Sequence, residues 1–66
     1  MPLIEIHLLK GRTAQEKKKL LASVTEAVAE SIDAPLQSIR VWINELSDED
    51  YMVAGHMASD RKKQPD

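Results

Sequence analysis

Pro2, the second residue of the chain, could supply a base that few proteins possess. If Met1 is removed, as we expect before a small second residue, Pro2 carries a free secondary amine, whereas every other backbone nitrogen belongs to an amide. An N-terminal amine ordinarily titrates near pH ~7.7–8.0, so it can exchange a proton close to neutral pH. The proline ring also removes one backbone torsion and fixes the direction of the lone pair. Because Met-Pro is also a common start to a chain, this base is a hypothesis that needs support from other residues.

Two arginines stand where stability alone does not favour them. Arg12 lies beside the expected start of a helix, where the helix dipole disfavours a cation by about 0.3–1 kcal/mol. Arg40 lies in an otherwise apolar strand segment, where a charge is costly unless it is paired or solvated. Each has an ordinary structural explanation, namely that Arg12 snorkels and that Arg40 pairs with an acid such as Glu5. Together with Pro2, however, they form a set of one amine base and two guanidiniums, which bind carboxylates well and lower the pKa of a nearby amine.

The size of the chain limits what it can do alone. With 66 residues it forms a single domain, 1–66, and a chain of this length buries only about 60% of its unfolded surface. Such a small core rarely supplies more than ~3–5 kcal/mol, so disulfides, a metal ion or association with other chains is usually needed. The sequence has no Cys, and His7 and His56 are too isolated to predict a zinc site. We therefore expect a homo-oligomer and no metal.

Composition argues against several classes of protein. The net charge of −2, the pI near 5.6, the single Trp and the single Tyr do not suit a nucleic-acid-binding surface. No apolar run approaches the ~18–20 residues of a membrane-spanning helix, so we expect no membrane partner. The start of the chain has no basic segment followed by an apolar one, so no signal peptide is predicted and we expect a cytoplasmic location.

The spacing of apolar residues predicts a strand followed by a helix. Residues Leu3 to Leu9 alternate, with one fully apolar face expected to pack on a helix and one mixed face that suits an interface between subunits. Thr13 and Glu16 match a capping box, so a helix should begin there and run to about Ile32. Its apolar stripe is predicted from Leu20, Val24, Ala27, Val28 and Ser31, with Lys17, Lys18 and Lys19 on the solvated side.

A second strand and a hairpin should follow this helix. The segment Asp33-Ala34-Pro35 ends the helix, because a proline disfavours helical conformation in the residue before it. Ser38–Leu46 is predicted as the second strand, which makes a right-handed βαβ unit with parallel strands. Tyr51 to Val53 should form one arm of a short C-terminal hairpin, and residues 59–66 should form a frayed tail. The predicted fold class is therefore α+β, a single βαβ unit plus a hairpin.

Five short patterns occur in order along the chain. They are Pro2, Gly11-Arg12 before the capped helix, Asp33-Ala34-Pro35, Ser38-Ile39-Arg40-Val41, and Tyr51 before Gly55. In this order they resemble the small tautomerases of the 4-oxalocrotonate (2-hydroxymuconate) tautomerase family. Each pattern is weak alone, but the ordered set is fairly specific and covers residues 2–58, nearly the whole chain.

The resemblance implies a tautomerase-like protomer that assembles as a homohexamer, a trimer of dimers. It implies that Pro2 is the general base and that Arg12 binds the distal carboxylate of the substrate. Arg40 would come from a neighbouring subunit and bind the 2-hydroxy or 2-keto oxygen and the adjacent carboxylate, while Tyr51 lines a hydrophobic wall. The implied reaction converts a 2-hydroxydienoate such as 2-hydroxymuconate to its conjugated 2-keto form, in aromatic hydrocarbon catabolism and without a cofactor.

The chain departs from the family pattern around the implied wall. Tyr51 stands where Phe, or Trp in relatives, is typical, and the acidic residues 48–50 precede it. It is followed by Met52-Val53-Ala54-Gly55 where a small, glycine-rich stretch is usual. Trp42 occupies a strand position where smaller aliphatic residues are usual. A related haloacrylate dehalogenase or hydratase is one alternative function, although such relatives carry an acid where this chain has Val53. A non-catalytic oligomeric scaffold of the same fold is the other, and the physiological substrate stays open.

Overall fold

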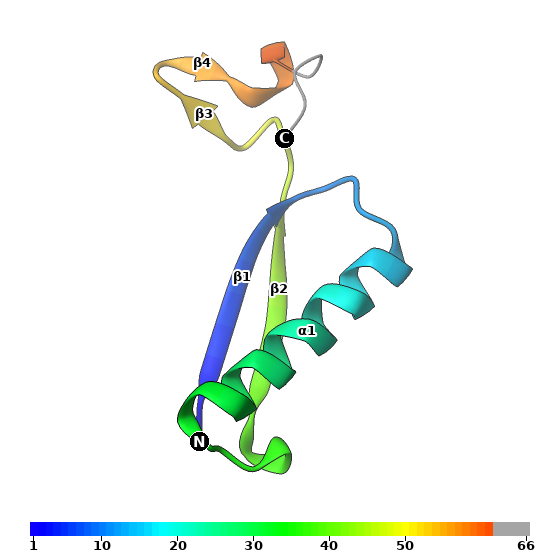
Figure 1. Cartoon of the computed structure of the whole chain (residues 1–66). Coiled ribbons are helices and arrows are strands. Elements are labelled where there is room, and N and C mark those ends of the chain that lie inside the picture. Colours follow the sequence, from blue (N-terminus) through cyan, green and yellow to red (C-terminus); the bar gives the residue numbers. More distant parts are fainter. Residues whose placement is uncertain (62–66) are drawn as a thin grey trace.

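The computed structural model describes residues 1–61 and confirms the predicted α+β fold (Figure 1). A strand, a long helix and a second strand form the βαβ unit, and a short hairpin follows. The elements are β1 (Leu3–Leu9), α1 (Ala14–Ile32), the 3-10 turn η1 (Leu36–Ser38), β2 (Arg40–Leu46), β3 (Met52–Val53), β4 (His56–Met57) and the 3-10 turn η2 (Ala58–Arg61).

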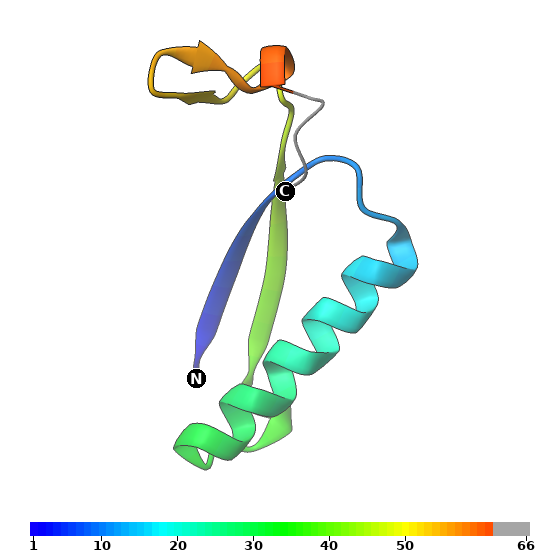
Figure 2. The same ribbon diagram turned by 45° about the horizontal axis from the view of Figure 1, so that its top comes forward.

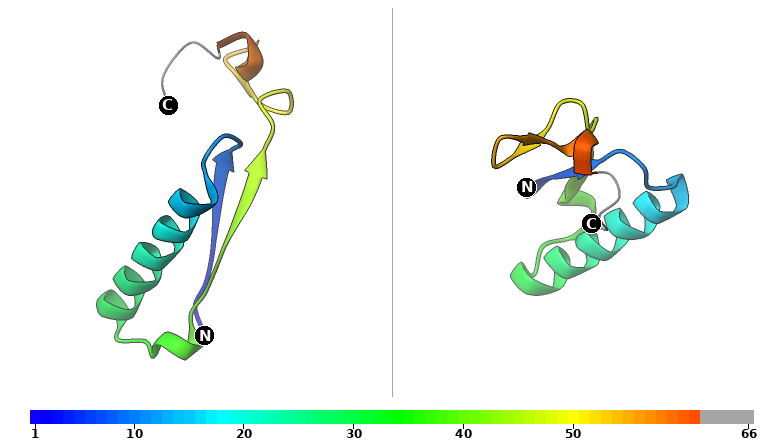
Figure 3. Two further views of the ribbon diagram at one scale, coloured as in Figure 1. Left: turned by 90° about the vertical axis from the view of Figure 1, so that its right-hand side faces the viewer. Right: turned by 90° about the horizontal axis from the view of Figure 1, so that it is seen from above.

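The two long strands pair in parallel, and α1 covers only one face of the pair (Figures 2 and 3). The register runs from Leu3 opposite Arg40 to Leu9 opposite Leu46. Side chains that alternate toward α1 are half-buried, whereas those on the other face, such as Glu5 and Trp42, are exposed. The predicted division of both strands into a helix-facing face and a mixed face is therefore confirmed.

The ends of α1 follow the sequence signals. The hydroxyl of Thr13 accepts a hydrogen bond from the backbone N–H of Glu16, and the Glu16 carboxylate accepts one from the backbone N–H of Thr13. This is the predicted capping box, with both reciprocal bonds present. At the other end, Asp33 adopts a left-handed conformation with φ of 55°, and Pro35 follows in an extended one. The helix therefore stops where the proline predicts.

Two details of the prediction are wrong. The second strand begins at Arg40 and not at Ser38, because residues Leu36–Ser38 form a 3-10 turn in which the Ser38 backbone N–H and hydroxyl both donate to the Pro35 carbonyl. Along α1, the half-buried face consists of Lys17, Leu20, Leu21, Val24, Thr25, Val28 and Ala29, whereas Ala27 and Ser31 are exposed. Lys17 therefore does not belong to the solvated side with Lys18 and Lys19.

The C-terminal hairpin is small. Met52 pairs with Met57 and Val53 with His56, and the connecting residues Ala54 and Gly55 both have positive φ, 54° and 82°. Positive φ at both central positions is what a type I′ hairpin turn requires, and Ala tolerates it less well than Gly. Part of the predicted tail, Ser59 and Asp60, lies in η2, where the Ser59 backbone N–H donates to the Asp48 carbonyl. Residues 62–66 lie outside the described residues.

The single chain is elongated and has little core of its own. It measures 42 × 23 × 15 Å, and its radius of gyration is 14.8 Å, whereas a compact chain of this length has about 11 Å. Among residues 1–61 only Ile39 counts as buried hydrophobic, and the exposed large apolar residues are Met1, Leu3, Ile32, Leu36, Trp42, Tyr51 and Met52. Of the helices described here, none is long and apolar enough to cross a membrane.

Candidate active site

Pro2 lies immediately before β1 and is half-buried. Its carbonyl oxygen accepts a hydrogen bond of 3.0 Å from the backbone N–H of Arg40, which continues the pairing of β1 with β2 by one step. Met1 is attached in this structure, so the Pro2 nitrogen belongs to a peptide bond here. The amine base predicted from the sequence would exist only after Met1 is removed.

Arg40 is the first residue of β2 and lies on the exposed face of the strand pair. Its Nη1 donates to the carbonyl oxygen of Gln37 at 2.6 Å, across η1. Glu5, the acid considered as its partner, instead accepts from Asn44 Nδ2 at 3.2 Å and lies 4.0 Å from His7 Nε2. Because Pro2 alternates to the half-buried side, Pro2 and Arg40 of one chain lie on opposite faces of the strand pair.

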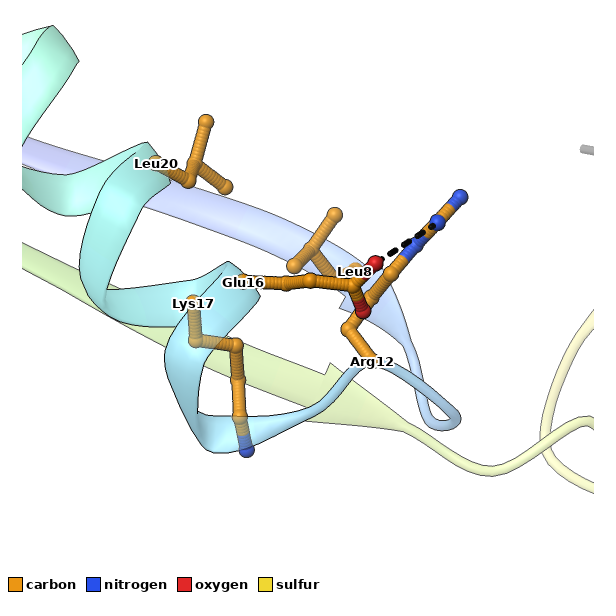
Figure 4. Close-up of a pocket in the computed structure, with 5 residues that line it drawn as sticks. All are labelled: Leu8, Arg12, Glu16, Lys17 and Leu20. Atoms are coloured by element: carbon orange, nitrogen blue, oxygen red, sulfur yellow. Dashed lines mark ion pairs between the residues drawn. The ribbon is translucent and has the colours of Figure 1, made fainter.

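Arg12 lies in the loop between β1 and α1, at the other end of β1 (Figure 4). Its side chain is 50% exposed, and its Nη1 lies 4.0 Å from Oε2 of Glu16. A hollow of about 210 Å³ opens beside this pair, lined by Leu8, Arg12, Glu16, Lys17 and Leu20. Since β1 has seven residues that each advance about 3.3 Å, Arg12 is separated from Pro2 of the same chain by roughly 20 Å or more.

The cap sets the charge state of this hollow. The hydrogen bond from the Thr13 backbone N–H, and to a smaller extent the Arg12 guanidinium, hold the pKa of Glu16 below its ordinary value of 4.5, although some loss of hydration opposes this. The carboxylate is ionised at neutral pH, as an ordinary glutamate is, and these contacts stabilise the ionised form. Lys17, the next residue of α1, has its ammonium 3.1 Å from Oε2 of Glu45.

Tyr51 follows β2 and precedes β3, so it lies toward the same end of the molecule as the β1–α1 loop (Figure 1). Its side chain is 40% exposed, and its carbonyl accepts a 2.8 Å hydrogen bond from the Ala58 backbone N–H. The hairpin that it begins extends beyond the end of β2 and does not fold back over the βαβ unit (Figure 3).

A single chain thus does not assemble the predicted set. Pro2 and Arg40 lie at one end of the strand pair, on opposite faces, and Arg12 and Tyr51 lie toward the other end. A site that contains both Pro2 and Arg12 would therefore need at least two chains.

From the sequence, Glu16 was predicted only as part of the helix cap and Lys17 only as a solvated residue. In the structure both residues line the hollow, Glu16 next to the Arg12 guanidinium and Lys17 with its ammonium pointing away from it (Figure 4). The helical period could have shown the burial of Lys17, because it stands three and four residues before Leu20 and Leu21 on the half-buried face. The proximity of Glu16 to Arg12 could also have been predicted, since Glu16 follows Arg12 by four residues.

Other parts of the described chain offer no further candidate chemistry. A second hollow of about 410 Å³ lies between α1 and the start of β2, lined by Leu21, Ala22, Thr25, Glu26, Leu36, Ile39 and Val41. It contains none of the candidate site residues. Within residues 1–61, no three His, Cys, Asp or Glu side chains converge where they could share a metal ion.

Comparison with known proteins agrees with the fold and with the resemblance. A family model described as "Tautomerase enzyme" matches residues 2–61. A 2-hydroxymuconate tautomerase of Pseudomonas putida is 42% identical over 59 residues, which cover 89% of this chain and 94% of the relative. Among solved structures, one from a study of the 4-oxalocrotonate tautomerase isozymes of Methylibium petroleiphilum is 41% identical, with a TM-score of 0.88 over 92% of this chain and 95% of that one.

A heterohexameric 4-oxalocrotonate tautomerase from Chloroflexus aurantiacus is 30% identical, with a TM-score of 0.85 over 89% of this chain and 95% of that one. Both the sequence match and the structural match therefore extend over nearly the full length of the proteins compared. On this evidence the chain belongs to the tautomerase family and is an isomerase that interconverts keto and enol forms.

Proposed function

We propose that the protein is a cofactor-independent tautomerase that converts a 2-hydroxydienoate of the 2-hydroxymuconate type to its conjugated 2-keto form. The observation that carries this proposal is the 42% identity to a 2-hydroxymuconate tautomerase over nearly the whole of both chains. The presence of Pro2, Arg12 and Arg40 supports it, since these residues supply a base and two carboxylate-binding groups.

Pro2 acts as the general base in this proposal, once Met1 has been removed. Its neutral amine takes a proton from the 2-hydroxyl group of the substrate, or from the carbon next to the ketone, and returns that proton elsewhere on the conjugated chain. Negative charge develops on the dienolate oxygen during this transfer, and the Arg40 guanidinium stabilises it. Arg12 binds the distal carboxylate, and Tyr51 forms part of the apolar wall.

The active site in this proposal is shared between copies of the chain in a homohexamer, a trimer of dimers. The separation of Pro2 from Arg12 along β1 supports a shared site, and so does the exposed face that carries Leu3 and Trp42. The outer edges of β1 and β2 have no strand partner within residues 1–61, and a two-stranded sheet is marginal alone. Antiparallel pairing of two copies would bring Pro2 of one chain toward the Arg12 end of its partner.

The test compares Pro2→Ala with the parent protein. An intact-mass measurement first establishes that Met1 is absent from both. The parent should then ketonise 2-hydroxymuconate and the analogue phenylenolpyruvate. Pro2→Ala should lose most of its kcat/KM, because its primary amine lacks the ring that fixes the direction of the lone pair. Pro35→Ala, which changes a proline in the loop after α1, is the matched control and should keep its activity. Equal activity of Pro2→Ala and the parent would show that the proline amine is not the base, and no activity in either would favour a non-catalytic scaffold.

A further inference from the structure

Glu16 lies beside the arginine that the proposed function assigns to the distal carboxylate of the substrate. Its Oε2 is 4.0 Å from Nη1 of Arg12, and the Arg12 and Glu16 side chains are 50% and 54% exposed. In Figure 4 the carboxylate and the guanidinium lie next to each other, and the Lys17 ammonium points away from them. A substrate carboxylate that approaches Arg12 would therefore meet an anion already in place.

The helix cap holds this anion where it is. Oε1 of Glu16 accepts the Thr13 backbone N–H at 2.9 Å, and the Glu16 backbone N–H donates to Oγ1 of Thr13 at 3.1 Å. The carboxylate carries its charge at neutral pH, as an ordinary glutamate does, and the same contacts lower the pKa of Glu16 by stabilising this ionised form. Glu16 thus cannot move away from Arg12 without breaking the cap of α1.

The rest of the hollow does not offset this charge. Lys17, its other cation, is paired with Glu45 at 3.1 Å. The remaining lining residues, Leu8 and Leu20, are apolar and suit a hydrocarbon group better than a hydrated carboxylate.

We propose that Glu16 is a specificity-determining residue that partly neutralises Arg12 and so reduces the preference of the site for dicarboxylate over monocarboxylate enols. This inference rests on the proposed function, in which Arg12 binds the distal carboxylate. It predicts that the natural charge of residue 16 favours substrates whose distal end is apolar.

Glu16→Gln tests the proposal, because the Gln carbonyl oxygen can still accept the Thr13 N–H while the charge is lost. The measured quantity is the ratio of kcat/KM for 2-hydroxymuconate to kcat/KM for phenylenolpyruvate. We expect this ratio to rise about two- to five-fold, the range that an exposed ion pair typically provides. Glu26→Gln removes the same charge from an exposed position about three turns further along α1 and should leave the ratio unchanged. An unchanged or lower ratio in Glu16→Gln overturns the proposal.

The Arg12→Ala background separates a local effect from a general one. Because Glu16 is proposed to act through Arg12, adding Glu16→Gln to Arg12→Ala should no longer raise the ratio. A rise of the same size in that background would assign the effect to overall charge and would also overturn the proposal.

A binding measurement keeps this inference distinct from the proposed function. If the parent turns over neither enol, the proposed function fails, and the role of Glu16 is then decided with adipate, a saturated dicarboxylate. Adipate is titrated while the side-chain N–H resonance of Arg12 is followed by NMR. Adipate should bind Glu16→Gln about two- to five-fold more tightly than the parent. Equal affinity for the two proteins would overturn the inference.

Discussion

At the scale of single residues, both candidate arginines already have a partner within the single chain, an acid for Arg12 and a backbone carbonyl for Arg40. Arg12 has Glu16 beside it at 4.0 Å, and Arg40 donates to a backbone carbonyl at 2.6 Å. A guanidinium whose bonds are made to neutral or exposed partners can exchange them for a substrate carboxylate at modest cost, because such pairs contribute little in water. Both arginines therefore remain suitable ligands for an anion.

Arg12→Ala should distinguish substrates by their distal group. Removing a charge-assisted pair with a carboxylate costs about 1.5–3 kcal/mol, so we expect kcat/KM for 2-hydroxymuconate to fall about 10- to 100-fold. For phenylenolpyruvate, which has no distal carboxylate, the fall should be much smaller. Steady-state kinetics on both enols measure the difference.

Arg12→Lys serves as the control for charge alone, because it keeps the cation and loses the planar fork of the guanidinium. Its kcat/KM for 2-hydroxymuconate should lie between those of the parent and of Arg12→Ala. A loss of equal size on both substrates would show that Arg12 supports the structure of the loop and does not bind the distal carboxylate.

At the scale of elements, α1 is the part whose boundaries respond most directly to its sequence. The capping box of Thr13 and Glu16 fixes its start, and Asp33 in a left-handed conformation fixes its end. Because one face of α1 covers the strand pair, these two ends also position the β1–α1 loop with Arg12 and the turn that leads into β2. The cap therefore links helix stability to the geometry of the candidate site.

The cap should weaken in acid. The pKa of Glu16 is held below its ordinary value of 4.5 in the folded chain, first by the Thr13 backbone N–H. The unfolded chain consequently takes up the proton at a higher pH than the folded one. The stabilisation is fully present above about pH 4.5 and is lost as the pH falls through the lower, folded value.

Thermal unfolding followed by circular dichroism from neutral pH down to about pH 3 checks this expectation. The parent should exceed Glu16→Gln in Tm at neutral pH, and the difference should shrink in acid, whereas effects of the other carboxylates cancel in the comparison. A Tm difference that does not change with pH would mean that the ionised form of Glu16 contributes nothing to the cap.

The elements could be predicted from sequence because their signals are local. The bounds of β1, the capping box at Thr13 and the stop before Pro35 each depend on residues a few positions apart. The predicted start of β2 was wrong because Ser38 is as compatible with a strand as with a 3-10 turn. Its two hydrogen bonds to the Pro35 carbonyl place it in the turn. The burial of Lys17 agrees with the helical period of α1, whereas its contact with Glu45, 28 residues away in the sequence, is one that no local pattern encodes.

The candidate site is harder to predict than the elements, since it depends on distances that no local pattern encodes. Pro2 could be singled out by its amine, and Arg12 and Arg40 by their type and by their cost to stability. The separation of Pro2 from Arg12 follows from the length of β1, and the position of Arg40 near Pro2 follows from the parallel register, in which Leu3 lies opposite Arg40.

At the scale of the whole molecule, the single chain is more extended and exposes more apolar surface than a compact domain of its length. Its radius of gyration of 14.8 Å exceeds the roughly 11 Å of a compact chain, and large apolar side chains such as Leu3, Ile32 and Leu36 are more than half exposed. Small domains without disulfides usually obtain the missing burial by association. The same association would complete the site, so stability and activity should depend on it together.

Mixing two inactive variants tests this shared site directly. In the proposed assembly, Pro2 of one chain works with Arg12 of another, so Pro2→Ala and Arg12→Ala remove different parts of the same site from different chains. Unfolding the two variants together and refolding them at equal concentrations should form mixed oligomers. If chains combine at random, about a quarter of the sites receive an intact Pro2 and an intact Arg12, so about a quarter of the parent activity on 2-hydroxymuconate should return.

Two kinds of control belong to this experiment: each variant refolded alone, and each variant mixed with a Pro2→Ala, Arg12→Ala double variant. All of them should stay at the low activity of the single variant. If the mixture recovers nothing while sedimentation shows that mixed oligomers have formed, the two residues do not act across subunits.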